Sequence, residues 1–350
     1  MEWTNLLLDW FEKNARDLPW RRTRDPYCIL VSEVMLQQTR VNAVIGYYAR
    51  FLNAFPTLEA LSEADDEALL SHWEGLGYYS RARNLRRAAA MAVERFDARL
   101  PSDYGELLTL PGVGEYTAGA VASIAFKLPV PAVDGNVLRV LARLRNDAGD
   151  VADPAVKKRV RDWLMSGMPK DAPGKFNQAL MELGALICTP NGAPHCIHCP
   201  VKAYCMGFAA GTAETLPVRS AKKPRRIEEK TVFALTVDGR PLVYKRGEGV
   251  LKGLWQLPDA PGKLMRDEIL TRIGGFGLMP KGEIAIVERK HVFTHIEWRM
   301  RVCQCEVTGD TPAGWSVFTG EGALPTAYRV CLGSGKKRCA GGDDPKSPQI

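Results

Sequence analysis

Glu33 lies in a setting that suits a general acid. It belongs to Tyr27–Thr39, a predicted helix that begins at an Asp25-Pro26 cap. Most of its neighbours are apolar, and burial among them disfavours the charged form of a carboxyl group. The side chain is therefore expected to hold a proton near neutrality and to deliver it to a leaving group. The same pattern also fits a glutamate on a solvated polar stripe shared with Gln37, and the residue alone does not decide between the two.

A second carboxylate, Asp134, follows a glycine turn between two predicted helices. Residues 107–126 predict a short helix, the turn Pro-Gly-Val-Gly, and a second helix rich in small residues. Gly112 and Gly114 let the backbone turn sharply and expose consecutive N–H groups, which favours a bound phosphate. Asp134 opens the next predicted helix. It is either an ordinary N-cap or a carboxylate that faces the sugar of a chain bound by its phosphates.

Four cysteines with the pattern C-x7-C-x2-C-x5-C predict a closed metal centre. Their thiolates fall within a short segment that follows a predicted helix, and they suit a [4Fe–4S] cluster or a structural zinc ion. Spacing alone slightly favours zinc, and two nearby histidines could serve zinc as well. The expected ligands are Cys188, Cys196, Cys199 and Cys205.

Composition indicates an ordinary globular protein with room for two domains. The 350 residues are 46% hydrophobic and 25% charged, with a formal net charge of +7, which permits a polyanionic partner. The absence of a long apolar run or a signal peptide predicts a cytosolic protein without a membrane partner. Nine cysteines, four of them clustered, favour metal ligation over disulfides.

The pattern of residue types changes along the chain. Residues 1–211 alternate helical stretches with Pro and Gly breaks, whereas residues 230–332 predict strands around an Asp-Gly turn, with one helix near 263–273. Between them, residues 212–229 are basic and proline-containing and predict an extended linker. The tail, residues 333–350, is expected to be disordered. The fold class is mostly α in the first region and α+β in the second.

These motifs together resemble the MutY-type A/G-mismatch adenine DNA glycosylases of the endonuclease III helix-hairpin-helix superfamily. The resemblance covers residues 1 to about 330 and includes both domains. It is carried by LPWR at 18–21, SEVMLQQTRV at 32–41, GLGYYSRARNL at 75–85, LPGVGEYTAGA at 110–120, VDGNVLRVLAR at 133–143, FNQALMELGALIC at 176–188 and GLWQLP at 253–258.

The resemblance implies a helical glycosylase region with its helix-hairpin-helix at 107–126 and a [4Fe–4S] cluster loop at 188–205. Residues 230–332 resemble a Nudix fold without the acidic pairs that bind a diphosphatase metal. In catalysis, Glu33 would protonate adenine N7 and Asp134 would stabilise the oxocarbenium-like sugar or a covalent intermediate, with Asn136 and Tyr116 orienting them. The implied contacts to DNA, adenine or 8-oxoguanine are Arg16, Leu18, Arg21, Gln38, Tyr78, Gly112, Gly114, Gln178, Phe293, Thr294 and His295.

The implied substrate is double-stranded DNA with adenine opposite 8-oxoguanine or guanine. The implied enzyme is a monofunctional, monomeric base-excision glycosylase of the bacterial cytosol and nucleoid, with repair or replication partners along the linker. Tyr116 stands where strand-cutting relatives carry a lysine. Two departures are visible: seven residues separate Cys188 from Cys196 where the family has six, and the tail after Leu332 matches nothing in the family. Thr294 replaces the usual serine and keeps the hydroxyl. The alternatives are a bifunctional glycosylase/lyase and a non-catalytic Fe–S DNA-binding protein.

Overall fold

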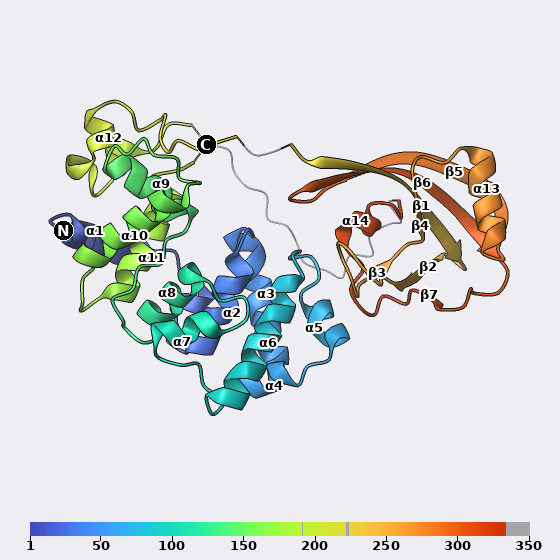
Figure 1. Ribbon diagram of the computed structural model, residues 1–350, viewed down its shortest axis with the longest axis horizontal. Helices are drawn as coiled ribbons and strands as arrows, with labels where there is room; N and C mark the ends of the chain where they lie inside the picture. The colour runs from blue at the N-terminus through green and yellow to red at the C-terminus, as the bar shows by residue number, and fades with distance from the viewer. Residues whose placement is uncertain (191, 222–223, 334–350) are drawn as a thin grey trace. The chain divides into compact units, whose positions relative to one another are not determined.

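The computed structural model describes residues 1–190, 192–221 and 224–333. The chain divides into two compact units, Met1–Lys222 and Lys223–Ile350. The first is helical and the second is built on a mixed sheet (Figure 1), which confirms the predicted fold class of each region. No helix in these described ranges is long and apolar enough to cross a membrane. The predicted disordered tail after Gly333 and the Lys222-Lys223 pair of the predicted linker lie outside the described residues.

Helices with short connections occupy most of residues 1–211, as the alternation of helical stretches with Pro and Gly breaks predicts. They are α1 (Thr4–Asn14), α2 (Pro26–Leu36), α3 (Val41–Ala54), α4 (Leu58–Ser62), α5 (Asp66–His72), α6 (Ser80–Arg95), α7 (Tyr104–Thr109), α8 (Glu115–Ile124), α9 (Gly135–Leu144), α10 (Pro154–Gly167), α11 (Pro173–Leu186) and α12 (Met206–Ala209), with short 3-10 turns at Pro19–Arg21, Cys196–His198 and Lys202–Tyr204.

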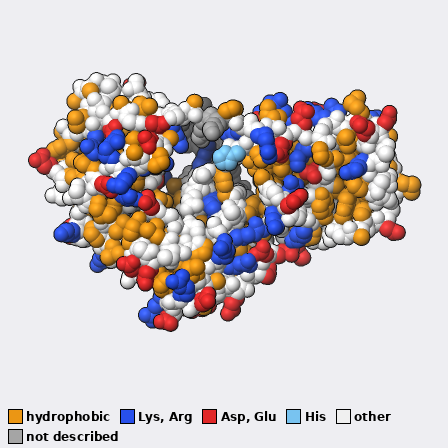
Figure 2. Space-filling model, in the orientation of Figure 1, with side chains coloured by type: hydrophobic (Ala, Val, Ile, Leu, Met, Phe, Trp, Pro, Cys, Tyr) orange, Lys and Arg blue, Asp and Glu red, His pale blue; other side chains and the backbone are white. Residues whose placement is uncertain are grey.

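Helix α2 is a central helix of this unit because apolar residues surround most of its circumference. It packs against α3 on one side and α8 on another, and α8 in turn packs against α11. A separate core joins α1, α9, α10 and α11 through side chains such as Leu7, Leu141, Leu164 and Phe176. On the face seen in Figure 2, Lys and Arg side chains gather over α3, α5 and α6.

The second unit contains a sheet with the strand order β3-β2-β1-β6-β5, with β4 paired to β1 and β7 paired to β2. Only the β1–β6 pair is parallel among the pairings of the described strands. The elements are β1 (Arg226–Val237), β2 (Arg240–Lys245), β3 (Trp255–Gln256), β4 (Asp259–Pro261), α13 (Arg266–Gly275), β5 (Met279–Val292), β6 (Ile296–Thr308), β7 (Trp315–Val317) and α14 (Thr326–Arg329).

Alternating side chains of β1 supply two cores on the two faces of this sheet, since successive residues of a strand point to opposite sides. Val232 packs with residues of α14, including Tyr328, whereas Phe233 packs with residues of α13, including Ile273. Strand β1 begins at Arg226, inside the segment predicted to be linker, because residues 226–229 pair with the first residues of β6. The extended conformation expected of a linker is here part of the sheet.

Candidate active site

Glu33 lies in the protein interior on α2. Asp25 caps this helix by accepting hydrogen bonds from the amides of Tyr27 and Cys28, at 2.8 and 3.2 Å. The cap and the apolar run hold Glu33 where only 6% of its surface is exposed. Burial raises the pKa of Glu33 from 4.5 to about 7, an effect opposed by a hydrogen bond from Tyr116 and increased by the charge of Asp134. The buried alternative of the sequence analysis is therefore confirmed over the solvated one.

Tyr116 connects the glycine turn to this acid. It lies in the first turn of α8, and its hydroxyl donates a hydrogen bond to Glu33 Oε2 at 2.5 Å. Burial and the neighbouring carboxylates raise the pKa of Tyr116 well above its usual value, so the phenol keeps its proton at neutral pH. A donor that stays protonated can fix one carboxyl oxygen of Glu33 and leave the other for a substrate.

Asp134 is the N-cap of α9, as the sequence allowed. Its Oδ1 accepts from the Val137 amide and its Oδ2 accepts from the Asn136 side chain, both at 2.7 Å. Burial raises the pKa of Asp134, while these hydrogen bonds and the charge of Arg139 lower it. Burial prevails and the net pKa of Asp134 is raised, while the two donors and the helix N-terminus favour its ionised form against that burial.

Arg139 of α9 extends this network away from Asp134. Arg139 donates to Asn136 Oδ1 at 2.9 Å and to the carbonyl oxygens of Gly184 and Cys188, both at 2.8 Å. A Cβ on Gly184 would lie 2.7 Å from Asn136 Cβ, so only glycine allows α11 to approach so closely. The sequence analysis missed Arg139, although it lies one helical turn after Asn136.

A buried ion-pair cluster occupies the start of the chain and α11. Glu182 is 1% exposed, and it accepts paired hydrogen bonds from both Arg16 and Arg21, at 2.7–3.1 Å. Burial opposes ionisation, but the two arginines outweigh it and lower the pKa of Glu182 to about 2. The charge of Arg21 reaches Glu33 and lowers its pKa slightly. Leu18, expected to contact DNA, is only 5% exposed and packs in the interior.

The glycine turn has the geometry that its sequence predicts. Gly112 has φ +78°, and a Cβ there would lie 2.7 Å from Asn84 Cβ of α6, so the position needs glycine on two counts. Gly114 is exposed at the N-terminus of α8. Among the other predicted contact residues, Gln38 and Tyr78 are exposed, and Gln178 is half-buried on α11, where its amide donates to Gly174 O.

The four cysteines gather around α9 and the end of α11. Arg143 donates to Cys188 Sγ at 3.3 Å, and the Cys205 thiol donates to Arg143 O at 3.4 Å. Burial, together with the charges of the other three cysteines, raises the pKa of Cys199 to about 12. In the part of the chain that the structure describes, no three His, Cys, Asp or Glu side chains form a group that could hold a metal ion. The identity of a metal centre therefore remains a prediction.

Phe293, Thr294 and His295 lie in the second unit, in the turn between β5 and β6. The turn is closed by a hydrogen bond from Phe293 N to Ile296 O at 2.8 Å, and the Phe293 ring contacts that of Trp298 edge-on at 4.7 Å. Thr294 and His295 are exposed. Thr294 and His295 thus form the exposed tip of this turn, and the contacting rings of Phe293 and Trp298 lie beneath it.

Comparisons with known proteins relate the chain to base-excision DNA glycosylases. Residues 31–165 match the HhH-GPD superfamily of base excision DNA repair proteins. The chain is 32% identical to the rat adenine DNA glycosylase, over 98% of this chain and 80% of that protein. It is 44% identical to the mouse adenine DNA glycosylase (85% and 69%) and 37% identical to that of Mycolicibacterium smegmatis (79% and 96%).

Two solved structures share the fold of the helical region. A thermostable thymine-DNA glycosylase superposes with a TM-score of 0.53 at 28% identity, covering 59% of this chain and 95% of that one. A trapped covalent intermediate of endonuclease III with DNA superposes with a TM-score of 0.51 at 27% identity, covering 59% and 94%.

Proposed function

Because the chain belongs to the adenine DNA glycosylase family, we propose that it removes adenine mispaired with 8-oxoguanine or guanine from double-stranded DNA. The observation that carries this proposal is the buried pair of carboxyl groups, Glu33 with a pKa of about 7 and Asp134 with two hydrogen-bond donors. An acid and an ionised carboxylate side by side are what hydrolysis of a glycosidic bond requires.

The reaction begins with extrusion of the adenine, because its glycosidic bond is inaccessible inside a duplex. Glu33 gives its proton to adenine N7 as the bond from N9 to the sugar C1′ breaks and its electron pair moves into the base. Tyr116 holds the other oxygen of Glu33 and so presents the proton in one direction. Gln178, half-buried on α11, is proposed to contact the extruded base.

The sugar that remains carries positive charge at C1′, which Asp134 stabilises or captures as a covalent bond. Asn136 fixes one oxygen of Asp134, and Arg139 fixes Asn136 in turn. A water molecule then attacks C1′, breaking the C1′–O bond to Asp134 where that bond has formed, and passes a proton to Glu33, leaving an abasic site. Tyr116 offers no amine to attack C1′, so we propose a hydrolase without strand-cutting activity.

Recognition of the partner base is assigned to the second unit. We propose that Phe293, Thr294 and His295 read 8-oxoguanine, since an exposed hydroxyl and imidazole over an aromatic ring can hydrogen-bond a base edge beside a wedge. Thr294 keeps the hydroxyl of the serine usual in the family.

The four cysteines are proposed to hold a [4Fe–4S] cluster. Four thiolates are the donor set of such a cluster. The charges of Cys188, Cys196 and Cys205 act on Cys199, so the four cysteines share one neighbourhood, although the described side chains do not form a ready metal-binding group. When bound through Cys188, Cys196, Cys199 and Cys205, the cluster would supply iron–thiolate bonds that tie this loop together.

The test is single-turnover release of adenine from a duplex that holds one adenine opposite 8-oxoguanine. We expect release from this duplex, slower release opposite guanine, and none opposite thymine. The strand should remain intact until the abasic site is treated with base. Strand cleavage at the rate of adenine release would instead support the glycosylase/lyase, and tight binding without release would support a non-catalytic DNA-binding protein.

Adenine release should depend on pH through Glu33. The group acts as an acid, so the active form is protonated and predominates below its pKa of about 7. The rate constant should be nearly level below about pH 6 and fall about tenfold for each pH unit well above 7. The measurement is the single-turnover rate constant from pH 5 to 9, with DNA binding measured in parallel. A rate that rises with pH across this range would contradict the acid role.

A further inference from the structure

Two exposed residues of the helical unit have backbone conformations that ordinary side chains rarely adopt. Gln38, in the turn between α2 and α3, has φ +57°, and Tyr78, in the loop before α6, has φ +47°. Such conformations persist only where the surrounding structure enforces them, and they are frequent at functional sites. Contacts with the rest of the helical unit must therefore fix the backbone of both loops.

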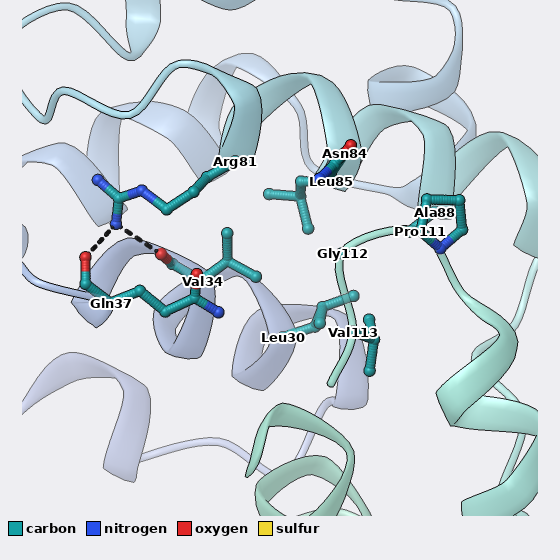
Figure 3. A pocket seen from close by; sticks show the side chains of 10 residues that line it. All are labelled: Leu30, Val34, Gln37, Arg81, Asn84, Leu85, Ala88, Pro111, Gly112 and Val113. Carbon is teal, nitrogen blue, oxygen red and sulfur yellow. Dashed lines mark hydrogen bonds between the residues drawn. The ribbon is translucent and has the colours of Figure 1, made fainter. Parts of the chain in front are cut away.

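Arg81 of α6 holds the first of these loops. Its Nη1 donates to the carbonyl oxygens of Val34, Met35 and Gln37, at 2.8, 3.0 and 2.6 Å, and its Nη2 reaches Thr39 Oγ1 at 3.3 Å. The last carbonyls of a helix have no partner within it, so the guanidinium caps the C-terminus of α2. Figure 3 shows the Arg81 side chain extended toward the end of α2.

The same guanidinium also holds the second loop. Its Nη2 donates to Leu76 O at 3.0 Å and to Gly77 O at 3.1 Å. Its central carbon lies 5.4 Å from the ring centroids of both Trp73 and Tyr78. A single planar group thus bonds the residue before Gln38 and the residue before Tyr78. The distance between the two exposed side chains depends on it.

Arg81 has no ion-pair partner among the carboxylates of the described residues, although it is 9% exposed. Burial lowers its pKa to about 10, which leaves it charged at neutral pH. The negative end of the α2 dipole and the loop carbonyls balance this charge. Beside Arg81, residues of α2, α6 and the glycine turn line a cavity of about 40 Å³ (Figure 3). Apolar packing is therefore incomplete here, and the hydrogen bonds of Arg81 are needed to connect α2 with α6.

We propose that Arg81 is a positioning residue that locks Gln38 and Tyr78 together as a two-pronged wedge for the base stack. This inference rests on the proposed function, because the wedge serves extrusion of the adenine. Arg81 acts before the chemical step, so its loss should slow unstacking and leave Glu33 and Asp134 unchanged. Only a planar fork with several donors reaches both loops, and lysine cannot replace it.

The test compares Arg81→Lys with the wild type on two substrates. The first is the fully paired duplex with adenine opposite 8-oxoguanine, and the second holds the same adenine in an unpaired bubble. We expect single-turnover release to fall at least about tenfold on the duplex and by less than about threefold on the bubble, where unstacking is already complete. Equal losses on both substrates would overturn the proposal. Arg95→Lys, the same change at an exposed position of α6, is the matched control and should leave both rates unchanged.

A second measurement does not depend on adenine release. 2-Aminopurine placed beside the mispair brightens when it unstacks, and the wild type should produce this signal while Arg81→Lys should not. When Gln38→Ala is already present, Arg81→Lys should slow adenine release only slightly further, because both changes remove the same wedge. Full additivity of the two changes, or a normal 2-aminopurine signal from Arg81→Lys, would overturn the inference. Failure of the wild type to release adenine would instead count against the proposed function.

Discussion

Asp134→Asn should abolish nearly all adenine release while the protein stays folded and binds DNA. Asparagine is as good an N-cap as aspartate, so the amide of Val137 keeps its acceptor and α9 keeps its start. The negative charge that would stabilise C1′ is lost. We expect the single-turnover rate constant to fall roughly 10³-fold or more, as for other charge-stabilising groups.

The control for this variant is its affinity for the duplex and its thermal unfolding, both of which should stay close to those of the wild type. The Asn136 amide donates to Asp134 Oδ2, so it has to rotate or lose this hydrogen bond when that oxygen becomes an amide nitrogen. That adjustment is small beside the loss of charge. A variant that still releases adenine within about tenfold of the wild-type rate would remove Asp134 from the catalytic role.

Glu33→Gln should slow adenine release by about 10²- to 10⁴-fold and remove the fall in rate above pH 7, because the amide carries no transferable proton. The shape of the side chain is kept, and Tyr116 can still donate to its oxygen. Single-turnover rates over the same pH range measure both effects. A variant that kept the wild-type pH profile would show that another group donates the proton.

The same substitution should stabilise the fold, and the sign follows from the raised pKa. Glu33 has a pKa of about 7 in the folded protein and an ordinary value of 4.5, so it binds its proton more tightly in the folded state. The free energy of unfolding of the wild type therefore falls as the pH rises from 4.5 to 7. The full loss is about 3 kcal/mol above pH 7. The variant should therefore gain in melting temperature over the wild type at pH 8 and differ little at pH 4.5. If the variant and the wild type had the same melting temperature at both pH values, a buried Glu33 with a raised pKa would be contradicted.

The sequence was informative where local chemistry decides the structure. The Asp-Pro cap and apolar run around Glu33 predict its helix and leave a buried acid as one of two alternatives. The glycines of the 107–126 hairpin predict its turn. It was uninformative where a long polar side chain can either face solvent or fold back into the interior. Arg81 and Arg139 look like surface arginines in the sequence, yet each is buried among carbonyl oxygens that only tertiary packing brings near.

Short and long-range features were missed for other reasons. Helix α4 has five residues, which is too few for a helical periodicity to appear. Glu182 finds Arg16 across 166 residues of chain, a partner that no local pattern indicates. The parallel pairing of β1 with β6 likewise places a strand where composition predicts a linker.

The contact between the first helix and α11 has a consequence for the order of folding. Leu7 and Phe11 of α1 pack in one core with Phe176 and Leu180 of α11, and the Arg16–Glu182 pair closes the same junction. A chain emerging from the ribosome cannot make these contacts until almost all of the first unit has been synthesised. Until then α1 has an apolar face without its partner, and loop closure over so long a segment is slow. Cotranslational folding of the catalytic unit therefore cannot bury Glu182 before α11 has emerged.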